Sequence, residues 1–238
     1  MAEGSNRERV IDSAKLIAWY DFQAPFYHFW RDRYNSRLVH KVASIIDPSG
    51  PKAALDAGCG TGLFTIGLAR LCKQHSFDGV DRSERMIEVG RKQVRRLELS
   101  NVSFRIGDVE ALPFAKASFD AVIAAGLFCN LNEPCRALGE FARVLKESGQ
   151  VIIVEFDRNF MTWDTRMFFN TMIAGYKIVS SCFTRFRFAE TWDINTSTIS
   201  EEKFKEALLT AGFDIRSVDR LENHVILHCR LHPRDECP

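Results

Sequence analysis

The chain has 238 residues and is 46% hydrophobic, which suits one α/β domain with a sizeable core and some additions. Its 32 basic and 31 acidic residues give a formal net charge of +1, so charge alone provides no general attraction to nucleic acid. The sequence has seven cysteines but no C-x-x-C pair, no apolar stretch of membrane-spanning length, and no secretory pattern in its N-terminal MAEGSNRERV, which together favour a cytoplasmic location.

The first predicted elements are a pair of helices within IAWYDFQAPFYHFWRDRYNSRLVHKVASII, residues 17–46. This stretch is rich in aromatic residues, which we expect to pack the helices onto the edge of a sheet. A more specific interpretation takes residues 1–50 as a helical lid that closes over a bound ligand. His28 could act there as a base near neutral pH, although packing or exposure is the simpler role for a lone histidine.

The next segment, LDAGCGTG at residues 55–62, is the most informative of the chain. It predicts a buried strand, a glycine turn and the start of a helix. Gly58, Gly60 and Gly62 remove three Cβ atoms where the chain turns, so that a ligand can lie against bare backbone. The unpaired N–H groups of the helix N-terminus favour an anionic group, and nucleotide-like cofactors bind at such turns. A plain tight turn is the alternative at this point.

The glycine spacing argues against a dinucleotide. The fingerprint G-x-G-x-x-G fails here because the third glycine comes too early, and position 65 is a threonine. S-adenosylmethionine has no phosphate, its carboxylate can use the backbone N–H groups, and its sulfonium would be served by a nearby negative charge. Asp56 is placed to provide that charge.

Two acids follow the next two predicted strands. Asp81 ends the strand in SFDGVD, 19 positions after Gly62, close to the spacing of about 20 for an acid that holds a ribose diol. Helix capping is the alternative for Asp81, but Ser83 is the better cap. Asp108 follows the third strand, where an adenine amino group would lie. A fourth strand, a helix from residue 136, a turn at Gly149 and a fifth strand complete this part.

The motifs LDAGCGTG, GVDRSERMIEVGR, GDVEALPFAKASFDAVIAA and RVLKESGQVIIVEF, with IAWYDFQ upstream, occur together and in order. With them the chain resembles class I S-adenosylmethionine-dependent methyltransferases, nearest to the ubiquinone/menaquinone biosynthesis C-methyltransferases and their type 11 relatives. The resemblance covers residues 14–157 and recurs more weakly in LLTAGF. It implies a Rossmann-like α/β fold: a seven-stranded, mostly parallel sheet with helices on both faces.

The resemblance also implies S-adenosylmethionine as the cofactor and residues 51–157 as the core that binds it. The implied cofactor-binding residues lie in the glycine loop, after the second and third strands, and at the end of the fourth: Asp56, Gly58, Cys59, Gly60, Thr61, Gly62, Asp81, Arg82, Met86, Asp108, Val109 and Ala125. Ala125 stands where quinone methyltransferases often carry a serine, so any contact there would use the backbone.

Residues 158–199 form a predicted helical insertion after the fifth strand. Its apolar stretch MFFNTMIAGYKIVSSCFTRFRF, with interspersed cations, predicts a cap over the site, and contact with a membrane surface is the alternative. This region departs from the quinone methyltransferases, because WDINTSTISEEKF stands in place of their usual segment. The identity of the acceptor therefore stays open.

Residues 200–238 predict a helix that ends at Gly212 and two final strands. His224, His228 and His232 share one face of the last strand and invite a metal hypothesis. They are too spread along the strand to converge easily on one ion, so we expect no metal site and an exposed sheet face.

The reaction expected is in-line methyl transfer to a small, hydrophobic or aromatic acceptor such as a quinol or phenol, which can be lipid-like. In such a reaction the protein mainly supplies orientation and a route for the acceptor's proton. The candidate catalytic residues are Tyr20, His28, Asn130 and Glu155, because the lid and the ends of the fourth and fifth strands should face the cofactor. A turn contact is the simpler role for Asn130, and a loop contact for Glu155.

Other classes stay open. A nicotinamide-dependent reductase is disfavoured by the glycine spacing and by the absence of a Tyr-x-x-x-Lys pair. An RNA methyltransferase is disfavoured by the net charge, and RKQVRR from Arg91 is better explained as the solvated face of a helix. A methyltransferase for a small polar metabolite and a non-catalytic cofactor-binding regulator also fit the motifs. The sequence indicates no oligomeric state.

Overall fold

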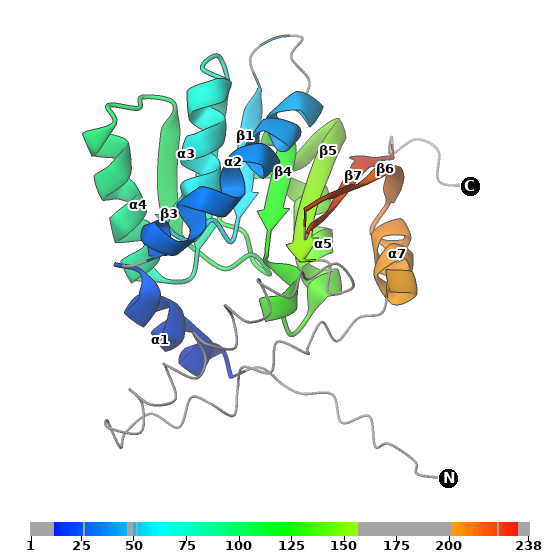
Figure 1. Ribbon diagram of the computed structural model, residues 1–238. Helices are drawn as coiled ribbons and strands as arrows, with labels where there is room; N and C mark the ends of the chain where they lie inside the picture. The colour runs from blue at the N-terminus through cyan, green and yellow to red at the C-terminus, as the bar shows by residue number, and fades with distance from the viewer. Residues whose placement is uncertain are drawn as a thin grey trace.

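The computed structural model describes residues 12–25, 27–46, 50, 52–156, 201–222 and 224–232. Its central feature is a seven-stranded sheet with the strand order β3-β2-β1-β4-β5-β7-β6 (Figure 1). The strands are β1 (Ala53–Ala57), β2 (Ser76–Asp81), β3 (Val102–Ile106), β4 (Phe119–Ala125), β5 (Leu145–Phe156), β6 (Phe213–Leu221) and β7 (His224–Leu231). Strands β1 to β5 run parallel to one another, and β7 runs antiparallel to both β5 and β6.

The described helices are α1 (Ser13–Gln23), α2 (Tyr27–Ile45), α3 (Leu63–Leu71), α4 (Glu84–Arg96), α5 (Pro134–Val144) and α7 (Glu201–Thr210), with a short 3-10 turn η1 (Phe128–Asn130). In Figure 1, α2, α3 and α4 lie on one face of the sheet, and α5 and α7 on the other. The predicted α/β class, with a mostly parallel seven-stranded sheet covered on both faces, is therefore confirmed.

Apolar side chains that point alternately to the two faces of the central strands explain the two layers of helices. On β4, Val122 and Ala124 belong to the apolar cluster that contains residues of α5 and α7. Their neighbours Ala121 and Ile123 belong to the cluster that contains residues of α2 and α3. Because successive side chains of a strand point to opposite faces, a strand that is apolar throughout needs cover on both sides.

The N-terminal helices are placed differently from each other. The second half of α2 buries Leu38, Val39 and Val42 against the sheet, so this helix is part of the core. Helix α1 lies instead beyond the carboxyl ends of the strands, next to α4 (Figure 1). It begins at Asp12, whose side chain accepts a hydrogen bond from the N–H of Lys15. Helix α1 and the first residue of α2, Tyr27, thus lie near the predicted site.

Helix α4 shows how local chemistry sets an element's bounds. Ser83 caps its start, since its hydroxyl accepts from the N–H of Met86. Glu84 lies in the first turn and two arginines lie in the last turn, and charges of these signs at these ends are stabilised by the helix dipole.

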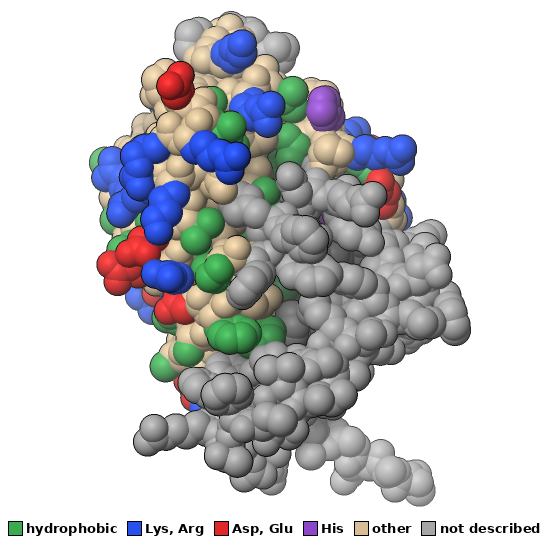
Figure 2. Space-filling view, turned by 60° about the vertical axis from the view of Figure 1, so that its left-hand side comes forward, with side chains coloured by type: hydrophobic (Ala, Val, Ile, Leu, Met, Phe, Trp, Pro, Cys, Tyr) green, Lys and Arg blue, Asp and Glu red, His purple; other side chains and the backbone are tan. Residues whose placement is uncertain are grey.

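Figure 2 shows Lys and Arg side chains gathered on one side of the face it presents. Four charged residues of α4 line a shallow depression of about 300 Å³: Glu88, Arg91, Lys92 and Arg95.

Strand β5 begins earlier than the sequence indicates. We expected a turn at Gly149 before the strand, but Leu145 already pairs with Phe119 of β4. The register then shifts, and regular pairing resumes where Gln150 lies opposite Ala121. The residues between Leu145 and Gln150 therefore interrupt a pairing that begins directly after α5.

Some predicted features lie outside the described residues, among them the cap insertion at 158–199 with its membrane alternative. Within the described part of the chain, no helix is long and apolar enough to cross a membrane.

Candidate active site

The site begins where β1 ends. The N–H groups of Gly58 and Cys59 both donate to the carbonyl oxygen of Val80 in β2, at 2.8 and 3.0 Å. These two bonds fix the glycine loop against the neighbouring strand. Gly58, Gly60 and Gly62 all have positive φ angles, of 72°, 55° and 75°, a backbone region that side chains with a Cβ rarely adopt. The loop therefore needs glycine for its own conformation, before any ligand is considered.

The three glycines differ in what surrounds them. A Cβ on Gly58 would lie 2.7 Å from a methyl carbon of Leu127, and one on Gly62 would lie 2.1 Å from Cζ of Phe104. Among the described residues, a Cβ on Gly60 would come within 4 Å of the Tyr27 ring alone, at 3.9 Å. The loop is thus packed tightly at Gly58 and Gly62, whereas the backbone at Gly60 stays accessible to a ligand.

Asp56, the last residue but one of β1, is a buried carboxylic acid with 1% of its surface exposed. Its Oδ2 accepts a hydrogen bond of 2.5 Å from the hydroxyl of Thr65 in α3. Burial raises the pKa of Asp56 to about 6; the Thr65 hydroxyl opposes this shift, and the charge of Asp81 adds to it. Asp56 therefore supplies negative charge behind the loop at neutral pH, at a cost in desolvation.

Asp81 lies between the loop and α4. Its Oδ2 accepts from the N–H of Gly60 at 2.9 Å, and its Oδ1 accepts from the N–H of Ser83 at 2.8 Å. Burial raises its pKa, and these two N–H donors partly offset the rise. Because a carboxylate offers about four lone-pair sites, Asp81 can still accept from two neighbouring hydroxyl groups. A ribose diol would need such acceptor positions, and the ribose contact of Asp81 stays a prediction.

Asp108 follows β3 and pairs with Arg82, at 2.6 Å. The same guanidinium lies 3.3 Å from Glu110. One oxygen of Asp108 also accepts from the N–H of Glu110, while Val109 between them is buried. Arg82 thereby connects the end of β2 to the end of β3, and the predicted contact of Asp108 and Val109 with an adenine stays a prediction.

Other predicted cofactor residues lie at the same edge of the sheet. Thr61 is fully buried, and its hydroxyl has no hydrogen-bond partner in the described part of the chain. Such a group is costly unless a ligand or another partner satisfies it. Cys59 is also buried, which raises the pKa of its thiol well above the usual range and leaves it inert. Met86 is buried at the start of α4, and Ala125 ends β4.

Asn130 and Glu155 brace the turn after β4. Glu155 Oε1 accepts from the N–H groups of Leu127 and Phe128, at 2.9 and 2.8 Å. The amide of Asn130 donates to the carbonyl oxygen of Gly126 at 3.1 Å. Both side chains thus hold the shape of one loop at the carboxyl edge of the sheet. Their predicted catalytic role is not tested by these contacts.

The other two catalytic candidates belong to the N-terminal helices. Tyr20 is a partly buried residue of α1. His28 lies in the first turn of α2, and its side chain is outside the described atoms. Two neighbours contact the site: Asp21, which the family resemblance places near the cofactor pocket together with Tyr20, accepts a hydrogen bond from Ser83, and Tyr27, which we did not single out, lies next to Gly60. The Tyr20–Asp21 pair and the aromatic stretch were the available signals.

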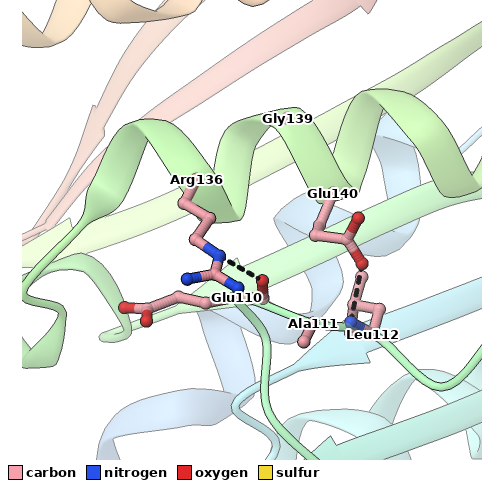
Figure 3. A pocket seen from close by; sticks show the side chains of 6 residues that line it. All are labelled: Glu110, Ala111, Leu112, Arg136, Gly139 and Glu140. Carbon is pink, nitrogen blue, oxygen red and sulfur yellow. Dashed lines mark hydrogen bonds between the residues drawn. The ribbon is translucent and has the colours of Figure 1, made fainter.

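A separate, open depression of about 530 Å³ lies between α5 and the segment after Asp108 (Figure 3). Its walls hold that segment in place, since Arg136 Nε donates to the carbonyl oxygen of Glu110 at 3.0 Å and Glu140 accepts from the N–H of Leu112 at 2.7 Å. Arg143 forms a two-bond pair with Glu140, at 2.7 Å each. No residue of the glycine loop lines this depression, so we assign it to support of the loop after β3.

The exposed sheet face that we expected for the three histidines is wrong, because β7 is an inner strand between β5 and β6: His224 is buried, His228 is half-buried, and the exposed His232 follows the strand. His228 Nε2 lies 2.9 Å from Oε1 of Gln150, and His232 lies 2.9 Å from Asp214. In the described ranges, no group of three or more His, Cys, Asp or Glu side chains could hold a metal ion.

The residues at the carboxyl edge fit S-adenosylmethionine. The backbone at Gly60, the hydroxyl of Thr61, which has no partner among the described residues, and the carboxylate of Asp81 could supply donors and acceptors for a carboxylate and a ribose. The buried carboxylate of Asp56 supplies negative charge. Sheet order and site together are those of a class I S-adenosylmethionine-dependent methyltransferase.

Comparison with known proteins supports the same class of enzyme. A family model described as "Methyltransferase domain" matches residues 49–212, more than half of the chain, and the chain belongs to this family. A demethylmenaquinone methyltransferase of Thermotoga maritima is 28% identical over 217 residues, which cover 87% of each chain. The chain is a class I methyltransferase whose cofactor is S-adenosylmethionine.

Two solved structures show how widely the fold is used. The [4+2]-cyclase SpnF aligns with a TM-score of 0.73 and 19% identity, covering 94% of this chain and 98% of its own. Geranyl diphosphate C-methyltransferase from Streptomyces coelicolor, in complex with S-adenosyl-L-homocysteine, aligns with a TM-score of 0.62 and 14% identity, covering 84% and 80%. At these identities the likeness shows the fold alone, so the acceptor must be argued from the site.

Proposed function

We propose that this enzyme transfers the methyl group of S-adenosylmethionine to a small, hydrophobic acceptor with an aromatic, quinol- or phenol-like ring. The observation that carries the proposal is an aromatic helix bonded to the cofactor edge. Helix α1 presents Trp19, Tyr20 and Phe22, and its Asp21 bonds to Ser83, two residues after Asp81. The similarity to demethylmenaquinone methyltransferases, whose name states a quinone-type substrate, supports the same class of acceptor.

Helix α1 carries one exposed aromatic side chain, Phe22, beside the buried Trp19, and this apolar pair suits contact with such a ring. Phe22 is 61% exposed and stacks with Trp19 at a centroid distance of 6.3 Å. A large exposed aromatic side chain is costly in water, and an apolar ligand lowers that cost by covering it. Helix α1 therefore serves as a lid with an apolar inner surface in this proposal.

When bound, S-adenosylmethionine supplies a methyl group on a good leaving group. The chain's own residues therefore mainly orient the acceptor and shield the reacting groups from water. Tyr20 and His28 are the groups we assign to hold or remove the proton of the acceptor hydroxyl. Asn130 and Glu155 are engaged with the backbone of the turn after β4, so we assign them to shaping the acceptor side of the site.

The test has two stages. Isothermal titration calorimetry with S-adenosylmethionine, and separately with S-adenosylhomocysteine, should show micromolar binding of either ligand. Methyl transfer from labelled cofactor is then measured with hydrophobic phenols and quinols, with small polar amines and acids, and with RNA. Turnover confined to the phenols and quinols is the expected result. Turnover confined to polar metabolites or RNA would refute the acceptor class, and binding without any turnover would favour a regulator.

A further inference from the structure

Helix α1 is joined to the cofactor edge by a hydrogen bond between residues far apart in the sequence. The hydroxyl of Ser83 donates to Oδ1 of Asp21 at 2.5 Å, across 62 positions of the chain. Asp21 lies in the last turn of α1, and Ser83 is the residue that caps α4. A bond to a carboxylate is stronger than one between neutral groups. The position of α1 is therefore coupled directly to the start of α4.

Ser83 is shared by two further contacts that concern the cofactor. Its hydroxyl oxygen accepts from the N–H of Met86 at 3.0 Å, and its own N–H donates to Asp81 at 2.8 Å. The other oxygen of Asp81 accepts from the N–H of Gly60 at 2.9 Å. A continuous series of hydrogen bonds thus runs from Asp21 through Ser83 and Asp81 to the glycine loop.

Each polar atom of Ser83 has its own hydrogen-bond role. Because its hydroxyl hydrogen is directed to Asp21, its oxygen lone pairs remain for the N–H of Met86, and the first turn of α4 is held in place. With that turn held, the N–H of Ser83 stays directed at Asp81. Loss of Asp21 leaves the hydroxyl free to rotate and removes the direct link from α1 to this turn.

We propose that Asp21 is a positioning residue for the cofactor, which acts through Ser83 on Asp81 and couples the docking of α1 to occupancy of the ribose position. The negative charge of Asp21 also raises the pKa of Asp81, so the two acids repel each other when nothing else is bound. Coupling is reciprocal: if docked α1 favours the cofactor, the cofactor favours docked α1 by the same factor. The proposal rests on the methyltransferase class and not on the acceptor.

Calorimetry with S-adenosylhomocysteine tests the coupling on the full chain. Asp21→Ala is expected to weaken binding about tenfold, at the lower end of coupling effects between sites. Asp21→Asn keeps an oxygen that accepts from Ser83 and is expected to stay within about twofold of the wild type. Asp12→Ala is the matched control, since it removes the cap of the same helix without touching Ser83. Equal weakening by Asp12→Ala and Asp21→Ala would assign the effect to the helix as a whole and overturn the proposal.

A double-mutant cycle isolates the bond. Ser83→Ala weakens binding by itself because it also removes the cap of α4. Adding Asp21→Ala to Ser83→Ala should then cost almost nothing more, whereas independent, multiplying effects would contradict the proposal.

Hydrogen exchange gives a readout that loss of stability alone does not produce. S-adenosylhomocysteine should slow amide exchange in Ser13–Gln23 in the wild type and in Asp21→Asn, and should leave it unchanged in Asp21→Ala. Wild-type protein that binds no ligand would refute the cofactor assignment and the coupling with it. Wild-type binding with an unaffected Asp21→Ala would overturn the positioning role alone.

Discussion

Asp56→Asn should change how the stability of this enzyme depends on pH. Burial raises the pKa of Asp56 from 3.8 to about 6 in the folded state, with a further contribution from Asp81. The folded protein therefore binds this proton more tightly than the unfolded chain does. The stability from the protonated form is fully present below pH 4 and is lost as pH rises through about 6. A difference of about 2 pKa units corresponds to roughly 3 kcal/mol.

The assay is denaturant unfolding at a series of pH values from 4 to 8, with wild type and variant compared at each pH. Other groups titrate in both proteins, so the quantity that matters is the difference between their unfolding free energies. That difference should move in favour of Asp56→Asn by about 3 kcal/mol between pH 4 and pH 7, because the neutral amide avoids the buried charge. Asp120→Asn is a useful comparison, since the pKa of Asp120 is lowered and the shift should have the opposite sign. A flat difference for Asp56→Asn would refute the reasoning.

Three further predictions concern the loop, the turn after β4 and the ribose contact. Gly62→Ala should lower the unfolding free energy by at least about 2 kcal/mol, because position 62 has a positive φ angle and a Cβ there would clash with Phe104. Gly139→Ala in α5 should raise the unfolding free energy by about 0.5–1 kcal/mol, because a Cβ there meets open space and alanine favours the helix. Equal effects of the two substitutions in thermal unfolding would contradict this reasoning. Glu155→Ala should cost about 2 kcal/mol by leaving two N–H groups unpaired, and Glu155→Gln clearly less, as measured by urea unfolding. Asp81→Ala should weaken S-adenosylmethionine binding by about 1–3 kcal/mol, and unchanged affinity in calorimetry would disprove the ribose contact.

The sequence predicted the parts of the site that local patterns encode. Gly58, Gly60 and Gly62 are conspicuous because a left-handed turn between a strand and a helix needs residues without a Cβ. Asp81 could be found from its position at the end of the next strand, since parallel strands bring their carboxyl ends to one edge. The fold class followed from the same succession of strands and helices.

Contacts between distant segments could not be predicted in this way. Phe104 is an ordinary apolar residue in the sequence, yet its ring fills the space that a Cβ on Gly62, Gly79 or Gly90 would need. The early start of β5 depends on pairing with Phe119, which no local signal reveals. The bond between Asp21 and Ser83 has the same character, because nothing in either segment indicates the other. Such features depend on tertiary packing, and the periodicity of apolar residues in the sequence does not reveal which distant segments pack together.

The carboxyl edge of the sheet combines features that each lower stability and that a single ligand can compensate. Burial raises the pKa of Asp56 and of the partly exposed Asp81, the charge of Asp81 adds to the shift at Asp56, and the hydroxyl of Thr61 is buried without a partner in the described residues. S-adenosylmethionine carries positive charge, ribose hydroxyls and a carboxylate, so it can neutralise the acids and hydrogen-bond the unsatisfied groups. A purely structural turn would have no reason to keep these costs together. The energetic cost of these groups is therefore an argument for a ligand at this edge, independent of the glycine motif.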